Sequence, residues 1–305
     1  MKVFLTGATG FIGGHLLTSL LEAGAEVRCL TRAESHLRNL QGLEVEVFTG
    51  DLRDESSFRS GLEDCEMAFH CAADYRLYSA NPDELYESNV EGTRNLMRAA
   101  SACGVKRVVY TSSVGALGLN PDGTPADEDT PVTLDDMVGH YKRSKFLAER
   151  VADEWVEKGL PIVIVNPSTP VGEADLKPTA TGQMIVDFLN RKTPAYVDTG
   201  LNLVDVHDVA LGHVRAAERG RVGEKYILGN RDMSLREIFQ TLGEMTGLPA
   251  PKLKVPHWLP LGWAALDTGF SRLVGRTPRV PLEAVRLSRY KMYFDPSKAV
   301  RELGL

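Results

Sequence analysis

Thr6-Gly-Ala-Thr-Gly-Phe-Ile-Gly13 is the stretch that decides the fold. It follows Val3–Thr6, a short apolar run that is typical of a buried strand. It opens Phe11–Ala23, where apolar side chains recur at helical spacing until Gly24 ends the pattern. A strand, a glycine-rich turn and a helix in this order predict the first unit of an α/β fold, with a turn that binds phosphate groups.

The glycines of this turn have separate predicted tasks. Gly7 allows the tight turn, Gly10 lets the backbone approach a pyrophosphate, and Gly13 lets the helix pack closely on the strand. A tight turn without a ligand is the alternative. The lysine of an ATP-hydrolysing loop is missing, so ATP hydrolysis is disfavoured. The residues expected to bind a dinucleotide here are Gly7, Thr9, Gly10, Phe11, Ile12 and Gly13.

Strands and helices continue to alternate along the first half of the chain. This alternation predicts parallel βαβ units in a Rossmann-type, doubly wound α/β sheet that is covered by helices on both faces. The expected strands are Val27–Leu30, Val45–Phe48, Met67–Cys71, Lys106–Thr111 and Pro161–Val165, and the expected helices are Asp83–Cys103 and Val138–Trp155.

After Asn166 the rhythm changes, because prolines and glycines interrupt residues 167–200. We predict a dinucleotide-binding domain of residues 1–166, to which 203–218 return, and a smaller C-terminal substrate-binding cap of 167–202 and 219–305. Further elements are expected as a helix within Val204–Glu218, a strand at Lys225–Leu228 and a helix at Leu235–Thr246.

The composition is that of an ordinary globular protein. Of the 305 residues, 43% are hydrophobic and 25% are charged, which excludes a disordered chain. The net charge of −6 argues against nucleic acid as a partner. The four cysteines lie in apolar runs without CxxC spacing, so neither a disulfide framework nor a metal site is expected. Without a signal-peptide pattern or a long apolar run, we expect a cytoplasmic protein with no transmembrane segment.

The apolar stretch Trp258–Phe270 allows two interpretations. It could lie on a membrane surface, since Trp258 and Trp263 are among its apolar residues. It could also form a helix that caps the substrate pocket or packs on the core. The second interpretation is favoured, because the stretch lacks the Lys/Arg-rich polar face of interfacial helices.

The end of the second predicted strand bears on the choice of cofactor. Folds that bind NAD place a carboxylate here for the ribose hydroxyls. In this chain Thr31 and Arg32 follow Val27–Leu30, and a guanidinium favours the 2′-phosphate of NADP. NADP is therefore the predicted cofactor, preferred over NAD. Asp51 and Leu52, after the third strand, are expected at the adenine, although Asp51 could instead cap a following helix.

Tyr141 and Lys145 are four residues apart and therefore share a face of their predicted helix. Ser113 lies after the fifth strand, at the carboxyl edge where α/β proteins bind ligands. A nearby ammonium and a charged nicotinamide would lower the pKa of the phenol from about 10 into a working range. We predict that Tyr141 exchanges a proton with the substrate, Lys145 lowers its pKa and binds the nicotinamide ribose, and Ser113 holds the substrate oxygen.

These motifs together resemble the extended short-chain dehydrogenase/reductase superfamily over nearly the whole chain. The motifs that carry the resemblance are TGATGFIG, HCAA at His70–Ala73, NVEGT at Asn89–Thr93, YTSS at Tyr110–Ser113, YKRSK at Tyr141–Lys145, NPSTPVG at Asn166–Gly172 and LVDVHDVA at Leu203–Ala210. The resemblance implies that Ala72 and Ala73 line the cofactor. It also implies that Pro167, Ser168 and Thr169 cover the nicotinamide carboxamide.

The resemblance gives three further residues a structural place. Asn89 would sit in the helix behind the serine-bearing strand, and His207 and Asp208 would anchor the returning segment. His207 and His213 are six residues apart, so they would lie on different faces of a helix and are not expected to share a metal ion.

Within the superfamily the chain is most similar to the hopanoid-associated sugar epimerase group, which itself resembles dihydroflavonol 4-reductases. AADYRLY at Ala72–Tyr78 and the run from 135 to 149 carry this similarity. Sugar 4-epimerases usually retain NAD and have an acid where Thr31 stands. Sugar dehydratases usually carry an Asp-Glu pair where Val114-Gly115 follows the serine. The Val27–Arg32 stretch is instead similar to the reductase branch.

The resulting hypothesis is an NADP(H)-dependent reductase of a ketone or aldehyde in a hydroxylated, partly apolar small molecule, with Tyr141 as proton donor. The alternatives are an NAD-dependent (nucleotide-)sugar epimerase and a non-catalytic cofactor-binding module. By analogy with the superfamily, the two long helices would form a homodimer interface. The candidate substrate contacts are Asp74, Tyr75, Ser113 and Tyr196.

Overall fold

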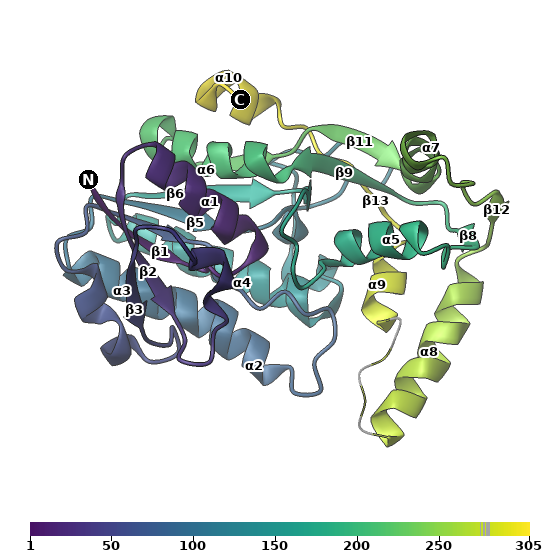
Figure 1. The fold of residues 1–305 in the computed structure, drawn as a ribbon, viewed down its shortest axis with the longest axis horizontal. Coiled ribbons are helices and arrows are strands. Elements are labelled where there is room, and N and C mark those ends of the chain that lie inside the picture. The colour runs from purple at the N-terminus through teal and green to yellow at the C-terminus, as the bar shows by residue number, and fades with distance from the viewer. Residues whose placement is uncertain (275, 277, 279–280) are drawn as a thin grey trace.

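The computed structural model describes residues 1–274, 276, 278 and 281–305. Its main sheet consists of β1 (Lys2–Thr6), β2 (Glu26–Thr31), β3 (Glu46–Thr49), β4 (Met67–His70), β5 (Arg107–Thr111), β6 (Ile162–Pro167) and β10 (Lys225–Leu228). The strands are parallel, in the order β10-β6-β5-β4-β1-β2-β3 (Figure 1). This confirms the predicted doubly wound sheet. The order reverses between β1 and β4, and ligands bind beside such a reversal.

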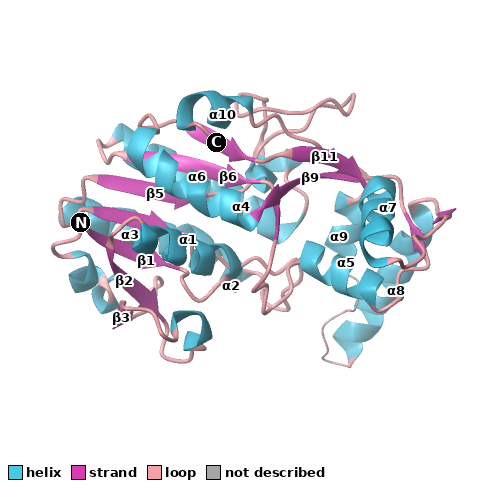
Figure 2. Ribbon diagram, turned by 45° about the horizontal axis from the view of Figure 1, so that its top comes forward, coloured by secondary structure: helices cyan, strands magenta, loops and turns pink. Residues whose placement is uncertain are grey.

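The longer helices over this sheet are α1 (Phe11–Glu22), α3 (Gly92–Ala102), α4 (Gly139–Glu157) and α6 (Val206–Arg219). Alternate residues of β1 point to opposite faces of the sheet. Val3 and Leu5 belong to a core cluster with apolar side chains of α1 and α6. Phe4 belongs to a second cluster with those of α3 and α4. Both faces are therefore covered, as Figure 2 also shows.

The predicted helix Asp83–Cys103 is wrong as a single regular element. The structure has a short α2 (Asp83–Tyr86), one π-helical turn at Glu87–Glu91, and then α3. The π turn contains Asn89, whose buried amide bonds the backbone of Asp74 in both directions, at 2.7 and 2.9 Å. Helical spacing cannot reveal such a turn, because its cause is a contact with a loop that is distant in sequence.

The cap contains a small sheet of β7 (Thr169–Val171), β9 (Gly200–Asp205), β11 (Arg231–Ser234) and β13 (Lys291–Met292). A second, parallel pair is formed by β8 (Ala195–Tyr196) and β12 (Leu253–Lys254). The cap helices gather beyond one end of the main sheet (Figure 2). They are α5 (Ala180–Leu189), α7 (Leu235–Thr246), α8 (Trp258–Leu273) and α9 (Leu282–Leu287).

The predicted cap boundary needs a correction. Residues 219–305 do not all belong to the cap, because β10 is an edge strand of the main sheet and pairs with β6. The C-terminal helix α10 (Ser297–Leu303) also packs there, with Ala299 and Leu303 in the same core cluster as α6. Residues 275, 277, 279 and 280 of the predicted cap lie outside the described residues.

Helix α8 forms as expected. Its tryptophans, Trp258 and Trp263, are 69% and 65% exposed, so the stretch does not bury them on a core. The inner face of the helix contributes Thr268 to the lining of a cavity beside the start of α4, as a capping helix would. No helix among the described residues is long and apolar enough to cross a bilayer.

Candidate active site

The glycine-rich turn joins β1 directly to α1, and two of its glycines are sterically required. Gly7 has a φ of +81°, and a Cβ atom there would lie 2.6 Å from the backbone nitrogen of Ala72. A Cβ atom on Gly13 would lie 2.0 Å from the carbonyl oxygen of Gly7. Gly10 precedes the first turn of α1 and offers no side chain to cap it. The turn is therefore a bare backbone cradle at a helix N-terminus, as phosphate binding requires.

A chain of hydrogen bonds holds this cradle against the end of β4. The backbone N–H of Ala72 donates to Thr6 Oγ1 at 3.1 Å, and Thr6 Oγ1 lies 2.9 Å from His70 Nδ1. His70 Nε2 lies 2.9 Å from Thr93 Oγ1, which donates to the carbonyl of Asn89 at 2.6 Å. Burial and then the nearby Lys145 lower the pKa of His70 to about 3, so the ring is neutral. These contacts fit one tautomer, in which Nε2 carries the hydrogen and donates to Thr93.

The structure brings Ser113 and Tyr141 together. The Ser113 side chain is close enough to the Tyr141 phenol to lower its pKa, and Lys145 follows one turn along α4. Ser113 Oγ also accepts from the backbone N–H of Gly115 at 3.0 Å, which fixes the serine rotamer. The chain thus presents a hydroxyl, a phenol and an ammonium at the carboxyl edge of the main sheet.

Two details of this group differ from the expectation. Burial raises the pKa of the Tyr141 phenol, and the nearby Ser113 side chain only opposes that rise. The buried Lys145 Nζ donates to Tyr110 Oη at 3.1 Å and to the carbonyl of Thr111 at 2.8 Å. Burial lowers the pKa of Lys145 to about 8. Protein groups alone therefore do not produce the lowered phenol pKa that the sequence predicted.

Glu149 is a buried member of the site that sequence reasoning missed. Its carboxylate accepts from Ser112 Oγ at 2.5 Å and from Asn166 Nδ2 at 2.9 Å, and it pairs with Lys225 Nζ at 2.6 Å. Asn166 Nδ2 also donates to the carbonyl of Ser113 at 3.1 Å. The sequence does contain an indication of this role. Glu149 continues the four-residue spacing of Tyr141 and Lys145, which places all three on one face of the helix.

The predicted adenosine end of the site lies beyond β2 and β3. Arg32 is exposed at the end of β2, in a weak pair with Glu34 at 3.4 Å. Asp51 accepts from the backbone N–H of Arg53 at 2.9 Å, and Arg53 chiefly, with Arg32 as a further charge, lowers the pKa of Asp51. The following 3-10 turn is capped by Asp54, so the alternative role of Asp51 as a helix cap is wrong. The adjacent Leu52 is half-buried and accepts a hydrogen bond from an asparagine of α3 through its carbonyl.

Several features of the site fit a dinucleotide. The cradle holds no side chain at its glycines, and Ala72, against which Gly7 packs, lies beside it together with Ala73. At the end of β6, Asn166 Oδ1 and, just after the strand, Ser168 Oγ are buried polar atoms without a hydrogen-bond partner. Such atoms are costly unless a ligand or water satisfies them. These two atoms belong to the same segment as Pro167, Ser168 and Thr169, which we expect to contact the nicotinamide carboxamide.

A cavity of about 380 Å³ lies between the main domain and the cap helices, beside the start of α4. His140, next to Tyr141, lines it together with Arg76 and with Thr268 of α8. Asp74 pairs with Arg76 at 2.5 Å, which places Asp74 next to this lining. Tyr75 is half-exposed, and its hydroxyl donates to the carbonyl of Lys177 in the cap at 3.4 Å.

Tyr196 is not brought to this cavity. It belongs to β8, which Figure 1 shows at the far end of the cap. Its register partner there is Lys254 of β12. Its predicted contact with substrate stays a prediction.

The returning segment is held at the start of α6. His207 Nδ1 lies 3.0 Å from Asp205 Oδ1, its Nε2 lies 3.2 Å from Glu173 Oε1, and its ring contacts that of His15. Asp208 follows in the first turn of α6 and is exposed. His213 is instead buried, 2.8 Å from Thr111 Oγ1, so it lies on another face from His207 as expected.

A family model described as the NAD dependent epimerase/dehydratase family matches residues 3–229. A relative from Synechocystis sp., which carries the provisional name dihydroflavonol 4-reductase, is 48% identical over 99% of this chain and 89% of its own length. Sterol demethylase protein B of Methylococcus capsulatus is 38% identical over 100% of this chain and 93% of its own.

A solved structure, that of the protein gox2253, superimposes with a TM-score of 0.88 at 45% identity, covering 99% of this chain and 92% of the other. The family match spans the phosphate cradle, the Ser113–Tyr141–Lys145 group and the whole main sheet. The chain belongs to the NAD-dependent epimerase/dehydratase family, the extended short-chain dehydrogenases/reductases, and is an NAD(P)-dependent enzyme.

Proposed function

We propose that the protein is an NADP(H)-dependent reductase that converts a ketone or aldehyde of a hydroxylated, partly apolar molecule into an alcohol. The observation that carries this proposal is the proximity of Ser113 and Tyr141, with Lys145 one helical turn from Tyr141, in a fold that also has a bare glycine cradle. The names of the two relatives, a dihydroflavonol reductase and a sterol demethylase protein, support a partly apolar ring compound as substrate.

In this proposal the side chains divide the work at the substrate carbonyl. Ser113 donates a hydrogen bond to the carbonyl oxygen and orients it toward Tyr141, which transfers its phenolic proton to that oxygen. When bound, the reduced nicotinamide supplies the hydride for the carbonyl carbon. Proton transfer leaves Tyr141 as a phenolate, which burial of the side chain disfavours. The positive charge of the Lys145 ammonium stabilises this phenolate.

The preference for NADP rests on Arg32. It is exposed at the end of β2, with only a weak ionic partner, and no carboxylate occupies the last positions of that strand. A guanidinium there is free to pair with a 2′-phosphate. Replacing Arg32 by Ser should weaken NADPH binding at least tenfold and leave NADH binding within about twofold. Equal loss for both cofactors would remove this argument.

The proposal is tested by incubating the protein with NADPH and a panel of cyclic and aromatic ketones and aldehydes. Loss of NADPH absorbance with formation of the alcohol is expected. Tyr141→Phe should abolish turnover while NADPH still binds, whereas Tyr290→Phe, at a 49% exposed tyrosine outside the site, should keep turnover.

The outcome that favours the epimerase alternative is different. The purified protein would then carry tightly retained NAD and interconvert a nucleotide sugar without net consumption of NADPH. A Tyr141→Phe enzyme with full ketone turnover would refute the proposed mechanism.

A further inference from the structure

Helix α8 carries an exposed apolar stripe. Leu259, Trp263, Leu266 and Phe270 follow the helical spacing of one face, and each is about half exposed or more, with Leu266 at 73%. Trp258 extends the stripe at the start of the helix. Contiguous apolar surface of this kind marks an interaction site in a folded protein.

The opposite face of α8 is buried and mixed in character. It holds the fully buried Ala264, and Thr268 and Ser271 are 7% and 0% exposed with hydroxyls that have no hydrogen-bond partner. Asp267 is also buried and pairs with Arg276 at 2.6 Å. The larger apolar side chains of the helix therefore lie on its outer face, where a folded domain usually exposes polar ones. Folding of this domain does not explain the outer stripe, which needs another apolar partner.

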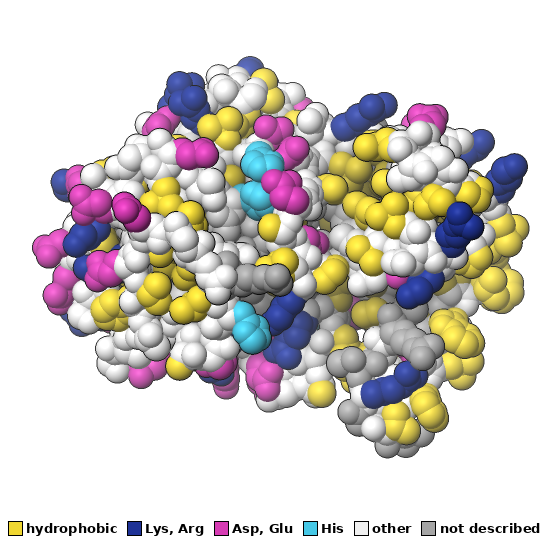
Figure 3. Space-filling view, viewed as in Figure 1, with side chains coloured by type: hydrophobic (Ala, Val, Ile, Leu, Met, Phe, Trp, Pro, Cys, Tyr) yellow, Lys and Arg dark blue, Asp and Glu magenta, His cyan; other side chains and the backbone are white. Residues whose placement is uncertain are grey.

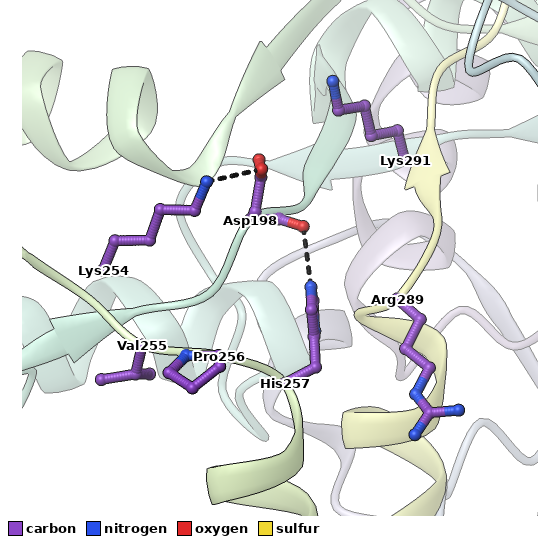
Figure 4. Close-up of a pocket in the computed structure, with 7 residues that line it drawn as sticks. All are labelled: Asp198, Lys254, Val255, Pro256, His257, Arg289 and Lys291. Atoms are coloured by element: carbon purple, nitrogen blue, oxygen red, sulfur yellow. Dashed lines mark hydrogen bonds and ion pairs between the residues drawn. The ribbon is translucent and has the colours of Figure 1, made fainter.

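A cationic cavity of about 650 Å³ lies at the start of α8. Lys254, Arg289 and Lys291 line it against a single acid, Asp198, which already pairs with Lys254 at 2.7 Å (Figure 4). His257, the residue before α8, also lines it and has a buried Nδ1 without a partner. The cavity therefore offers positive charge and an unused polar atom next to the apolar stripe.

The surrounding chain carries the same charge sign. Between Glu244 and Asp267 there is no acidic residue, whereas Lys252 and Lys254 are present. Exposed Met245 and Leu253 add apolar surface at this end of the cap. Figure 3 shows apolar side chains gathered over this end, with Lys and Arg side chains among them.

We propose that the cap docks on the surface of an anionic lipid bilayer. The stripe of α8 enters the interfacial region, where Trp side chains are favoured, and the cationic cavity takes the phosphate of an anionic headgroup. Lys254 comes from β12, Arg289 from the turn between α9 and β13, and Lys291 from β13 itself, so the fold rather than α8 supplies the positive charge. Charge complementarity selects a lipid surface over a second copy of this chain, which would bring the same cations.

The docked position places α8 between the bilayer and the cavity of about 380 Å³ that Thr268 and His140 line, and His140 precedes Tyr141 in the chain. An apolar molecule could then pass from the bilayer to this cavity past one helix. The docking itself does not depend on the proposed reductase activity.

The test is co-sedimentation of the full chain with vesicles of phosphatidylcholine, with and without phosphatidylglycerol. Binding is expected to the anionic vesicles and to fall as salt is raised. Leu266→Glu should lower the partition coefficient at least tenfold, and Arg289→Glu should remove most of the preference for the anionic lipid. Val222→Glu, at a 50% exposed apolar residue before β10, is the control and should bind like the wild type.

Circular dichroism checks that each variant keeps its helix content. The proposal is overturned if the wild type stays in the supernatant with both vesicles, or if Leu266→Glu binds like the Val222→Glu control. It is also overturned if light scattering finds a dimer that Leu266→Glu splits while vesicles bind neither protein. In that case the stripe joins two copies of the chain.

Discussion

Replacing Glu149 by Ala should strongly destabilise the protein. The carboxylate is fully buried and serves four groups, with Lys225 Nζ as the nearest cation at 2.6 Å. Removing one partner of a buried ion pair costs about 3–5 kcal/mol, because the other charge stays in a poorly solvated place. Lys225 keeps 18% of its side chain exposed and Asp153 at 3.8 Å, so the lower part of that range applies. We expect the free energy of unfolding to fall by about 3 kcal/mol.

A matched control lies on the same helix. Glu154 of α4 is half exposed and pairs with Arg94 at 3.1 Å. Exposed pairs of this kind contribute about 0–1 kcal/mol, so Glu154→Ala should change stability by less than about 1 kcal/mol. Helix propensity affects both substitutions alike and cancels in the comparison.

Urea unfolding followed by circular dichroism measures the difference. The wild type is compared with Glu149→Ala, Glu149→Gln and Glu154→Ala. One common slope of unfolding free energy against urea concentration is used for all four proteins. Glu149→Gln keeps an acceptor for Ser112 but loses the charge that Lys225 needs, so its stability should fall between the other two. If Glu149→Ala and Glu154→Ala unfold within about 1 kcal/mol of each other, the buried network around Glu149 does not contribute the stability that this prediction assigns to it.

Three further outcomes follow from the site. Gly13→Ala should abolish NADPH binding in a fluorescence titration, because the new Cβ atom would lie 2.0 Å from the carbonyl oxygen of Gly7. Unchanged affinity for NADPH would mean that the glycine cradle does not bind the cofactor. Burial lowers the pKa of His213 to about 4, so the unfolded state takes up the proton first as pH falls below about 6.5. His213 should therefore contribute about 3 kcal/mol to the loss of stability between pH 6.5 and 4, in addition to a similar loss from His70, whose pKa burial lowers to about 3. The slope of stability against pH should be shallower in His213→Asn. Burial lowers the pKa of Lys145 to about 8, so its ammonium loses a proton as pH rises through that value. The kcat/KM for carbonyl reduction should therefore decline above about pH 8. A kcat/KM that stays constant up to about pH 10 would contradict the proposed role of this charge.

The main domain could be predicted from the sequence because its signals are local. The apolar run of β1, the glycines of the turn and the spacing within α1 and α4 each act over a few residues. Tyr141 and Lys145 could be found for the same reason, since their spacing on one helix needs no tertiary contact. Ser113 required only the rule that ligands bind at the carboxyl edge of a parallel sheet.

The cap could not be predicted in this way. Strand β10 looks like any short apolar strand, and only its pairing with β6 places it in the main sheet. Helix α8 has apolar residues at helical spacing, but the sequence does not say which face meets the protein. The cations near it come from residues 254, 289 and 291, which the fold alone brings together.

The sequence motifs include His70, Asn89 and Thr93, but their spacing did not predict the contacts that these side chains make, which connect elements rather than reach the reacting atoms. His70 joins the phosphate cradle, through Thr6, to the π turn, through Thr93. In that turn, Asn89 Nδ2 donates to Ser144 Oγ on α4 at 3.0 Å, three residues from Tyr141. The phosphate-binding turn and the helix that carries the proposed proton donor are thus tied by a single run of neutral, buried hydrogen bonds. Because each link would be costly to leave unpaired, the run fixes the distance between the two ends of the cofactor site without any charge that could compete for the substrate.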